Sequence, residues 1–216
     1  MLKNKELKKI YFEGISKSLS NATDLFDDAD ILFKLKRYPR SYTLYQLTIE
    51  EVGKAAMIYD FILYKDFENK SEQQKFKKEF LSHKKKTKTS IGIDLLLAFQ
   101  IPNINLKNKL IHQVYDLDKD IDKLNDLKNN SLYTNIKNGQ FIVPKEEITQ
   151  EIAMNIKNIA HTRLNFAKKF YDVVVENFDE IKKCSKNIDK QEMIDNPPKE
   201  ILQLIKLEKG IEIFQK

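Results

Sequence analysis

The stretch that decides the fold reads RYPRSYTLYQLTIEEVGKAA and runs from Arg37 to Ala56. Its apolar residues recur three or four positions apart, which is the spacing of one face of an α-helix, and Pro39 suits the first turn of such a helix. The members of this apolar stripe are Tyr42, Tyr45, Ile49, Val52 and Ala56. We therefore expect a buried helix that begins near Pro39.

Three charged residues interrupt this apolar helix. Glu50 lies four positions and Glu51 three positions before Lys54, so the lysine can reach either carboxylate. A charged group beside a packed face costs free energy unless it is paired. The three side chains are therefore either a structural clasp or part of a site with acid–base chemistry, and the sequence leaves both readings open.

The composition predicts an all-α protein. The chain has 216 residues, of which 41% are hydrophobic and 32% charged, and this balance is typical of a globular protein with a sizeable core. Five Gly, five Pro and no Trp leave few positions that break helices. We expect a single domain over residues 1–216, built as a bundle of about five long helices.

The charge permits an anionic partner such as RNA without requiring one. The net charge is +6, but nearly all basic residues are lysines, which on a helix surface commonly serve only solubility. Cys184 is the single cysteine, so no intramolecular disulfide can form. The first ten residues lack the apolar run of a signal peptide, and no window is long and uncharged enough to span a membrane. We expect a cytoplasmic protein without a membrane segment.

The spacing of apolar residues predicts further helices on both sides of the Arg37–Ala56 stretch. The pattern Ser71-Glu-Gln-Gln74 has the form of a capping box that starts a third helix, which Gly92 can divide. The expected helices cover residues 2–35, 39–64, 71–99 and 105–124, a long segment from Pro144, and a short segment from Asn196-Pro-Pro198.

Residues 129–144 differ from the rest of the chain. Residues that favour strands flank Asn138-Gly139, which is the strongest short signal for a β-hairpin turn. We expect an extended loop or small hairpin that lies on the helices, because several of its apolar residues favour burial. These are Leu132, Tyr133, Phe141, Ile142 and Val143.

Three segments resemble the abortive-infection AbiV family, a phage-defence branch of the HEPN-like helical domains. Residues 50–55, Glu-Glu-Val-Gly-Lys-Ala, resemble its central signature, and residues 76–86 resemble its histidine-containing segment. Residues 131–144, followed by a long helix, resemble its third recurrent feature. The resemblance covers residues 20–175. It implies a homodimeric HEPN-like bundle that aborts phage infection inside bacteria, with a phage-encoded protein as a candidate trigger.

Relatives in the wider HEPN group are often metal-independent ribonucleases with an Arg-x4–6-His motif, and this chain departs from that pattern. Its arginines are Arg37, Arg40 and Arg163, and none of them precedes a histidine at that spacing. The nearest arrangement, His161-Thr-Arg163, has the reverse order. Whether the protein is an enzyme is therefore open from sequence.

His83 is the best candidate for a proton carrier, because an imidazole titrates near neutral pH and metal-free RNA cleavage needs a base and an acid. In this hypothesis Lys54, Lys86 and Arg40 stabilise phosphate charge, and Glu51 orients the cluster. The alternative is a histidine that pairs with a carboxylate for structural reasons. We find no spacing of residues typical of a metal site and no cofactor-binding motif, so we expect neither group.

A second function remains open, in which a non-enzymatic helical dimer binds and sequesters a phage or host protein. Tyr133, Phe141 and Tyr171 are candidate aromatic anchors for such a surface. His161 and Arg163 lie two positions apart in a helix and therefore face different sides, so that one of them can face a partner or a cleft.

Overall fold

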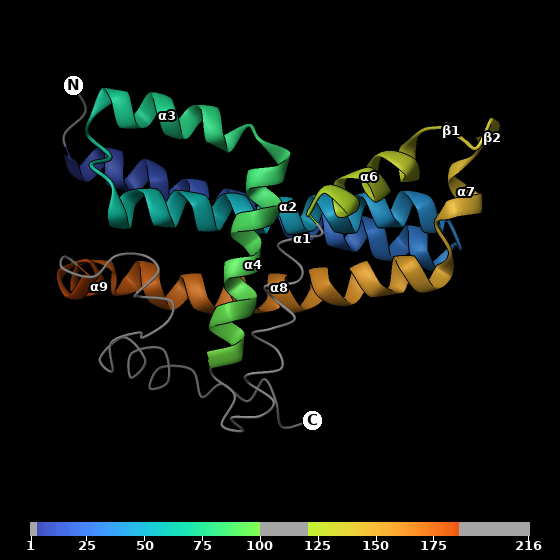
Figure 1. Cartoon of the computed structure of the whole chain (residues 1–216). Coiled ribbons are helices and arrows are strands. Elements are labelled where there is room, and N and C mark those ends of the chain that lie inside the picture. Colours follow the sequence, from blue (N-terminus) through green and yellow to red (C-terminus); the bar gives the residue numbers. More distant parts are fainter. Residues whose placement is uncertain (1–3, 100–120, 186–216) are drawn as a thin grey trace.

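The computed structural model describes residues 4–99 and 121–185, and helices dominate this part of the chain (Figure 1). The helices are α1 (Asn4–Lys34), α2 (Tyr38–Tyr64), α3 (Lys70–Phe80), α4 (His83–Phe99), α6 (Ile121–Leu132), α7 (Pro144–Glu147), α8 (Gln150–Glu176) and α9 (Phe178–Cys184). Two short strands, β1 (Asn135–Lys137) and β2 (Gln140–Ile142), pair in an antiparallel hairpin. The predicted all-α bundle with a small hairpin is therefore confirmed. Within residues 4–99 and 121–185, no helix combines the length and apolar character that a membrane crossing requires.

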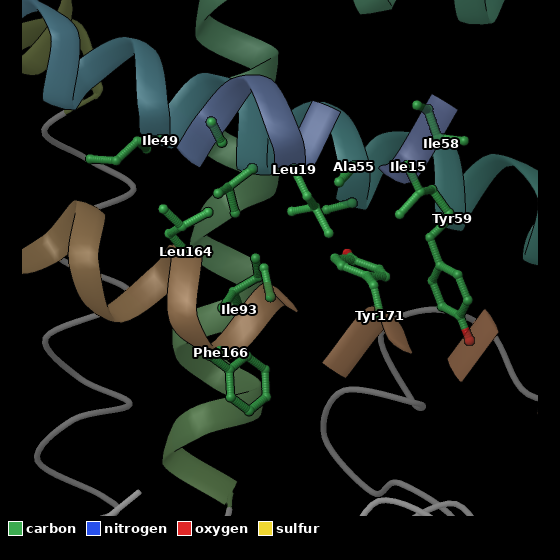
Figure 2. Close-up of a cluster of buried hydrophobic side chains, with 14 of the residues drawn as sticks. Ile15, Leu19, Ile49, Ala55, Ile58, Tyr59, Ile93, Leu164, Phe166 and Tyr171 are labelled. Atoms are coloured by element: carbon green, nitrogen blue, oxygen red, sulfur yellow. The ribbon is translucent and has the colours of Figure 1, made fainter. Parts of the chain in front are cut away.

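The core forms where α1, α2 and α8 run alongside one another and α4 crosses them (Figure 1). Figure 2 shows the side chains that meet there, including Leu19 from α1, Ile49 from α2 and Leu164 from α8. The predicted stripe on α2 is buried, and Tyr45 and Val52 are 0% exposed. Each fully buried side chain of this size contributes roughly 1.5–3 kcal/mol, so this stripe is a main source of the fold's stability.

The third predicted helix is two helices, and its start and its break both differ from the prediction. Asn69, not Ser71, caps α3, because its Oδ1 accepts hydrogen bonds from the backbone N–H groups of Ser71 and Glu72. The chain breaks before α4 at Leu81-Ser82 instead of Gly92. The Ser82 carbonyl accepts from Lys86 N at 3.1 Å, which places Ser82 at the N-cap position, immediately before α4 begins at His83.

The predicted helix from Pro144 is also interrupted. Pro144 begins only α7, and α8 begins after Thr149, whose hydroxyl accepts from the backbone N–H of Ile152. Ile148 lies between α7 and α8 in an extended conformation. Its side chain is buried in the core, with 1% exposed, at the point where the helix is interrupted. Most of the helix expected over residues 105–124 lies outside the described residues, and its described end belongs to α6. The segment expected from Asn196 lies entirely outside the described residues.

The hairpin forms where it was predicted, but it does not lie on the helices. Asn138 (φ 51°) and Gly139 (φ 77°) both have positive φ, as a tight hairpin turn requires. Leu132, Ile142 and Val143 are half-buried. Tyr133 and Phe141, however, are 66% and 75% exposed, so their predicted burial is wrong. The physical reason is position, because the hairpin projects from one end of the bundle, beyond the end of α6 (Figure 1).

A polar contact links the three long helices on the side of α2 that faces α8. The Tyr45 hydroxyl donates to Asp30 Oδ1 at 2.5 Å, and Lys157 Nζ lies 2.8 Å from the same oxygen. Burial alone would raise the pKa of Asp30, but the hydrogen bonds from Lys157 and Tyr45 and the lysine charge outweigh it and lower this pKa.

The lowered pKa of Asp30 predicts how stability depends on pH. A carboxyl whose pKa is lower in the folded state stabilises the fold above the unfolded pKa, about 3.9, and this contribution is lost as pH falls through the folded pKa. We expect Asp30→Asn to lower the free energy of unfolding modestly at pH 7 and to match the wild type in strong acid. Urea unfolding across this pH range measures the difference, and a difference that stayed constant with pH would contradict the prediction.

Candidate functional site

The candidate site forms where α4 crosses α2 at unusually close range. A Cβ atom on Gly53 would lie 2.0 Å from the carbonyl oxygen of Lys86, so only glycine allows the two backbones to approach this closely. The contact falls at the first turn of α4, which carries His83 and Lys86. Glu50 lies three residues before Gly53, so the crossing brings these two basic side chains to its carboxylate.

Glu50 is the centre of a cluster of charged side chains. It is 2% exposed, and His83 Nδ1 lies 2.5 Å from its Oε2 atom. Lys128 Nζ donates to Oε1 at 2.7 Å, and Lys86 Nζ lies 3.5 Å from Oε2. A carboxylate this deeply buried is tolerated because basic groups surround it. We call Glu50, His83, Lys86 and Lys128 the Glu50 cluster.

His83 is the one member of the cluster that reaches the surface. Its side chain is 57% exposed, whereas the side chains of Lys86 and Lys128 are 7% and 9% exposed. A carboxylate facing Nδ1 favours the tautomer that carries hydrogen on this atom, which leaves the lone pair of Nε2 free. The arrangement thus presents a basic nitrogen whose ring is held in place from the opposite side.

Contacts between α2 and the end of α6 place Lys128 in the cluster. The hydroxyls of Thr43 and Ser131 lie 2.6 Å apart, and Ser131 also donates to the Lys128 carbonyl. Arg40 NH1 donates to the carbonyls of Ser131 and Leu132, both at 3.1 Å. Carbonyls at the end of a helix lack partners within the helix, so Arg40 satisfies them and anchors α6 on α2.

These contacts join the three segments that the sequence singled out, from α2, from the start of α4 and from the end of α6. A family model, HEPN_AbiV (AbiV), matches residues 10–165. The chain belongs to the AbiV family. Membership associates it with abortive infection, a form of defence against phage, and confirms the predicted HEPN-like fold. Comparison with curated proteins and with solved structures found no match.

The AbiV match includes Glu51 and Lys54, which the structure places beside the cluster. Lys54 Nζ forms an ion pair with Glu51 and lies 5.6 Å from the centre of the Phe80 ring. We expected Glu51 to orient the cluster, but the carboxylate that contacts His83 is that of Glu50. Glu51 and Lys54 therefore form the ion pair that helical spacing suggested, and this pair lies next to Glu50, the partner of His83.

The remaining candidates in the AbiV chain lie away from His83. Arg163 is 2% exposed and clamps α8 to α4, with Nε and NH2 donating to the Asp94 carboxylate and NH1 to the Ser90 hydroxyl at 2.9 Å. His161 is exposed, and its Nε2 lies 2.9 Å from Asn165 Nδ2. The prediction that these two residues face different sides is confirmed. Tyr133 lies at the exposed end of α6.

Sequence reasoning missed Lys128 and the central position of Glu50. Lys128 is one lysine among many, and nothing in its neighbourhood marks it as buried. Glu50 was one of two adjacent carboxylates, and only its lower exposure distinguishes it from half-buried Glu51. Among residues 4–99 and 121–185 there is no group of three or more His, Cys, Asp or Glu residues that could hold a metal ion.

Proposed function

We propose that this protein is a cytoplasmic abortive-infection effector that stops phage propagation by cleaving or blocking RNA needed for translation. The observation that carries the proposal is the pair of an exposed His83 and a buried Glu50, joined at 2.5 Å. Family membership supports the defence role. The net charge of +6 favours association with RNA. As in other HEPN-like proteins, we take the acting form to be a homodimer.

In the proposed reaction His83 Nε2 takes the proton of an RNA 2′-hydroxyl, and the 2′-oxygen attacks the adjacent phosphorus. The bond to the 5′-oxygen breaks, the imidazolium returns its proton to that oxygen, and a 2′,3′-cyclic phosphate remains. Glu50 holds Nδ1–H and stabilises the imidazolium, as the aspartate does in catalytic triads. Two lysines face one carboxylate, so the cluster keeps an excess of positive charge beside the phosphate.

Lys54 and Arg40 would have a supporting role in this reaction. Both already have partners, Lys54 in Glu51 and Arg40 in the carbonyls at the end of α6. Arg40 is exposed and only its NH1 donates in these contacts, so the rest of its guanidinium can donate to a phosphate. Their contribution is therefore expected to be smaller than that of His83.

The proposal predicts that His83→Asn abolishes phage protection without unfolding the protein. Asparagine can still donate a hydrogen bond to Glu50 but cannot accept and return a proton at neutral pH. We expect plaque counts to rise to those of unprotected cells, and the melting temperature to stay close to that of the wild type. His83→Ala should lose protection as well.

Lys17→Ala is the matched control, since Lys17 is exposed and pairs only weakly with Glu13 at 3.6 Å. Purified wild-type protein in EDTA should yield RNA fragments that end in 2′,3′-cyclic phosphate, and His83→Asn should yield none. Full protection by His83→Asn would leave His83 a structural residue and would remove proton transfer from the proposal.

A further inference from the structure

One end of the molecule exposes large apolar side chains that the proposed RNA chemistry does not use. Tyr133, Ile136 and Phe141 are 66%, 59% and 75% exposed. All three lie within residues 133–141, at the end of α6 and in the hairpin. Scattered exposed apolar residues are ordinary, but several on one small structure commonly mark a binding surface.

The register of the hairpin gathers two of these side chains on one face. Ile136 is directly opposite Phe141, so both project from the same side of the two strands. The neighbouring pair, Lys137 and Gln140, projects from the other side, where Lys137 Nζ contacts Glu147 of α7 at 2.7 Å. The bundle therefore anchors one face of the hairpin, and the face with Ile136 and Phe141 points away from α7.

Among the described residues, the hairpin has one strand edge without a partner, that of β2, and a firmly held base. In β1 the outward-facing N–H of Ile136 already donates to Asn135 Oδ1 at 2.8 Å, whereas no described residue pairs with the outer edge of β2, which can therefore accept another strand. Glu146 Oε2 accepts from the backbone N–H of Val143 at 2.8 Å just after β2, and the Asn138-Gly139 turn closes the other end. A surface held in this way loses little conformational freedom on binding.

We propose that the hairpin β1–β2 binds an extended segment of another protein, which adds as a third strand at the outer edge of β2 and packs apolar side chains on Ile136 and Phe141. The area favours this occupant over a second copy of the chain. A stable dimer buries roughly 1,200–2,000 Å², and two strands of three residues each offer far less. They suit a short peptide with apolar residues at alternate positions.

The charge of the surface favours a polypeptide over RNA. Residues 129–144 contain one charged side chain, Lys137, and Glu147 already pairs with it. Strong binding of RNA requires several basic groups along the phosphates. Within the described residues, Tyr133, Ile136 and Phe141 make no hydrogen bond or ion pair with the Glu50 cluster. This inference is therefore independent of the proposed reaction at His83.

The test is a selection of random twelve-residue peptides, displayed on ribosomes, against the full-length protein. We expect enriched peptides in which apolar and polar residues alternate. Their affinity, measured by fluorescence polarisation, should fall at least tenfold for Phe141→Ser and for Ile136→Ser, with thermal unfolding unchanged. Methylation of alternate peptide amides should abolish binding, because strand addition needs these N–H groups.

The matched control is Leu81→Ser, which removes an apolar side chain that is 70% exposed between α3 and α4. This variant and His83→Asn should bind the peptides as the wild type does. No enrichment over background, or equal binding to Phe141→Ser, would overturn the proposal. The proposal would also be overturned if a twelve-nucleotide single-stranded RNA bound in place of the peptides and Phe141→Ser abolished the binding of this RNA.

Discussion

Replacing Glu50 with Gln is expected to lower the free energy of unfolding by about 3–5 kcal/mol, as removal of one partner from a buried ion pair does. The carboxylate is 2% exposed and balances Lys128, Lys86 and the imidazole of His83. An amide keeps the shape but not the charge, so two buried lysines would lose the carboxylate that they both face. Urea unfolding monitored by circular dichroism measures the loss.

Glu51→Gln is the matched control, since it makes the same chemical change one residue along the helix. Glu51 pairs with Lys54 on its own helix, and both side chains are partly accessible to water. Because water still reaches part of both groups, we expect a smaller loss for Glu51→Gln than for Glu50→Gln. Equal losses in the two variants would show that burial does not distinguish the carboxylates, and the Glu50 cluster would lose its energetic basis.

Gly53→Ala is expected to destabilise the protein by about 3 kcal/mol, the upper part of the usual range for overpacking. The added Cβ would meet the Lys86 carbonyl oxygen at 2.0 Å and its carbon at 2.7 Å. Backbone atoms cannot rotate away as a side chain can, so α4 must move from α2. That movement would also separate His83 from Glu50, and phage protection should fall although no ionisable group has been removed.

Gly92→Ala provides the contrast on α4. Apart from the backbone of α4 itself and the two adjacent residues, no described atom lies within 4 Å of a Cβ at this position, and alanine favours a helix over glycine by roughly 0.5–1 kcal/mol. We expect this variant to be slightly more stable than the wild type and fully protective. If both glycine variants were equally destabilised, the close approach at Gly53 would not be the cause.

Local patterns in the sequence were sufficient for much of the fold. The three- and four-residue spacing of Tyr42, Tyr45 and Ile49 predicted a buried α2, because helix geometry alone brings such residues to one face. Asn138-Gly139 predicted the hairpin, because those two residues tolerate the positive φ of its turn. The cap at Asn69 and the break at Ser82 were both missed, since Ser71 and Gly92 are equally plausible places for a helix to begin or break.

The site could be predicted only in part. The sequence pointed to His83, Lys86 and the carboxylates of α2, because their chemistry is evident from residue type. It could not choose between Glu50 and Glu51, since helical spacing connects either one to Lys54. It also could not mark Lys128, whose partner lies 78 positions away in the chain.

The sequence by itself thus determined which stretches are mainly helical, where the hairpin turns and which ionisable groups are present. Those properties depend on neighbours within a few residues. Only the tertiary structure decided that Glu50 is the buried carboxylate, that His83 is its exposed partner and that the hairpin points away from the core. Those properties depend on which helices cross and on how much water the crossing excludes. The close crossing of α2 and α4 is possible because Gly53 has no side chain.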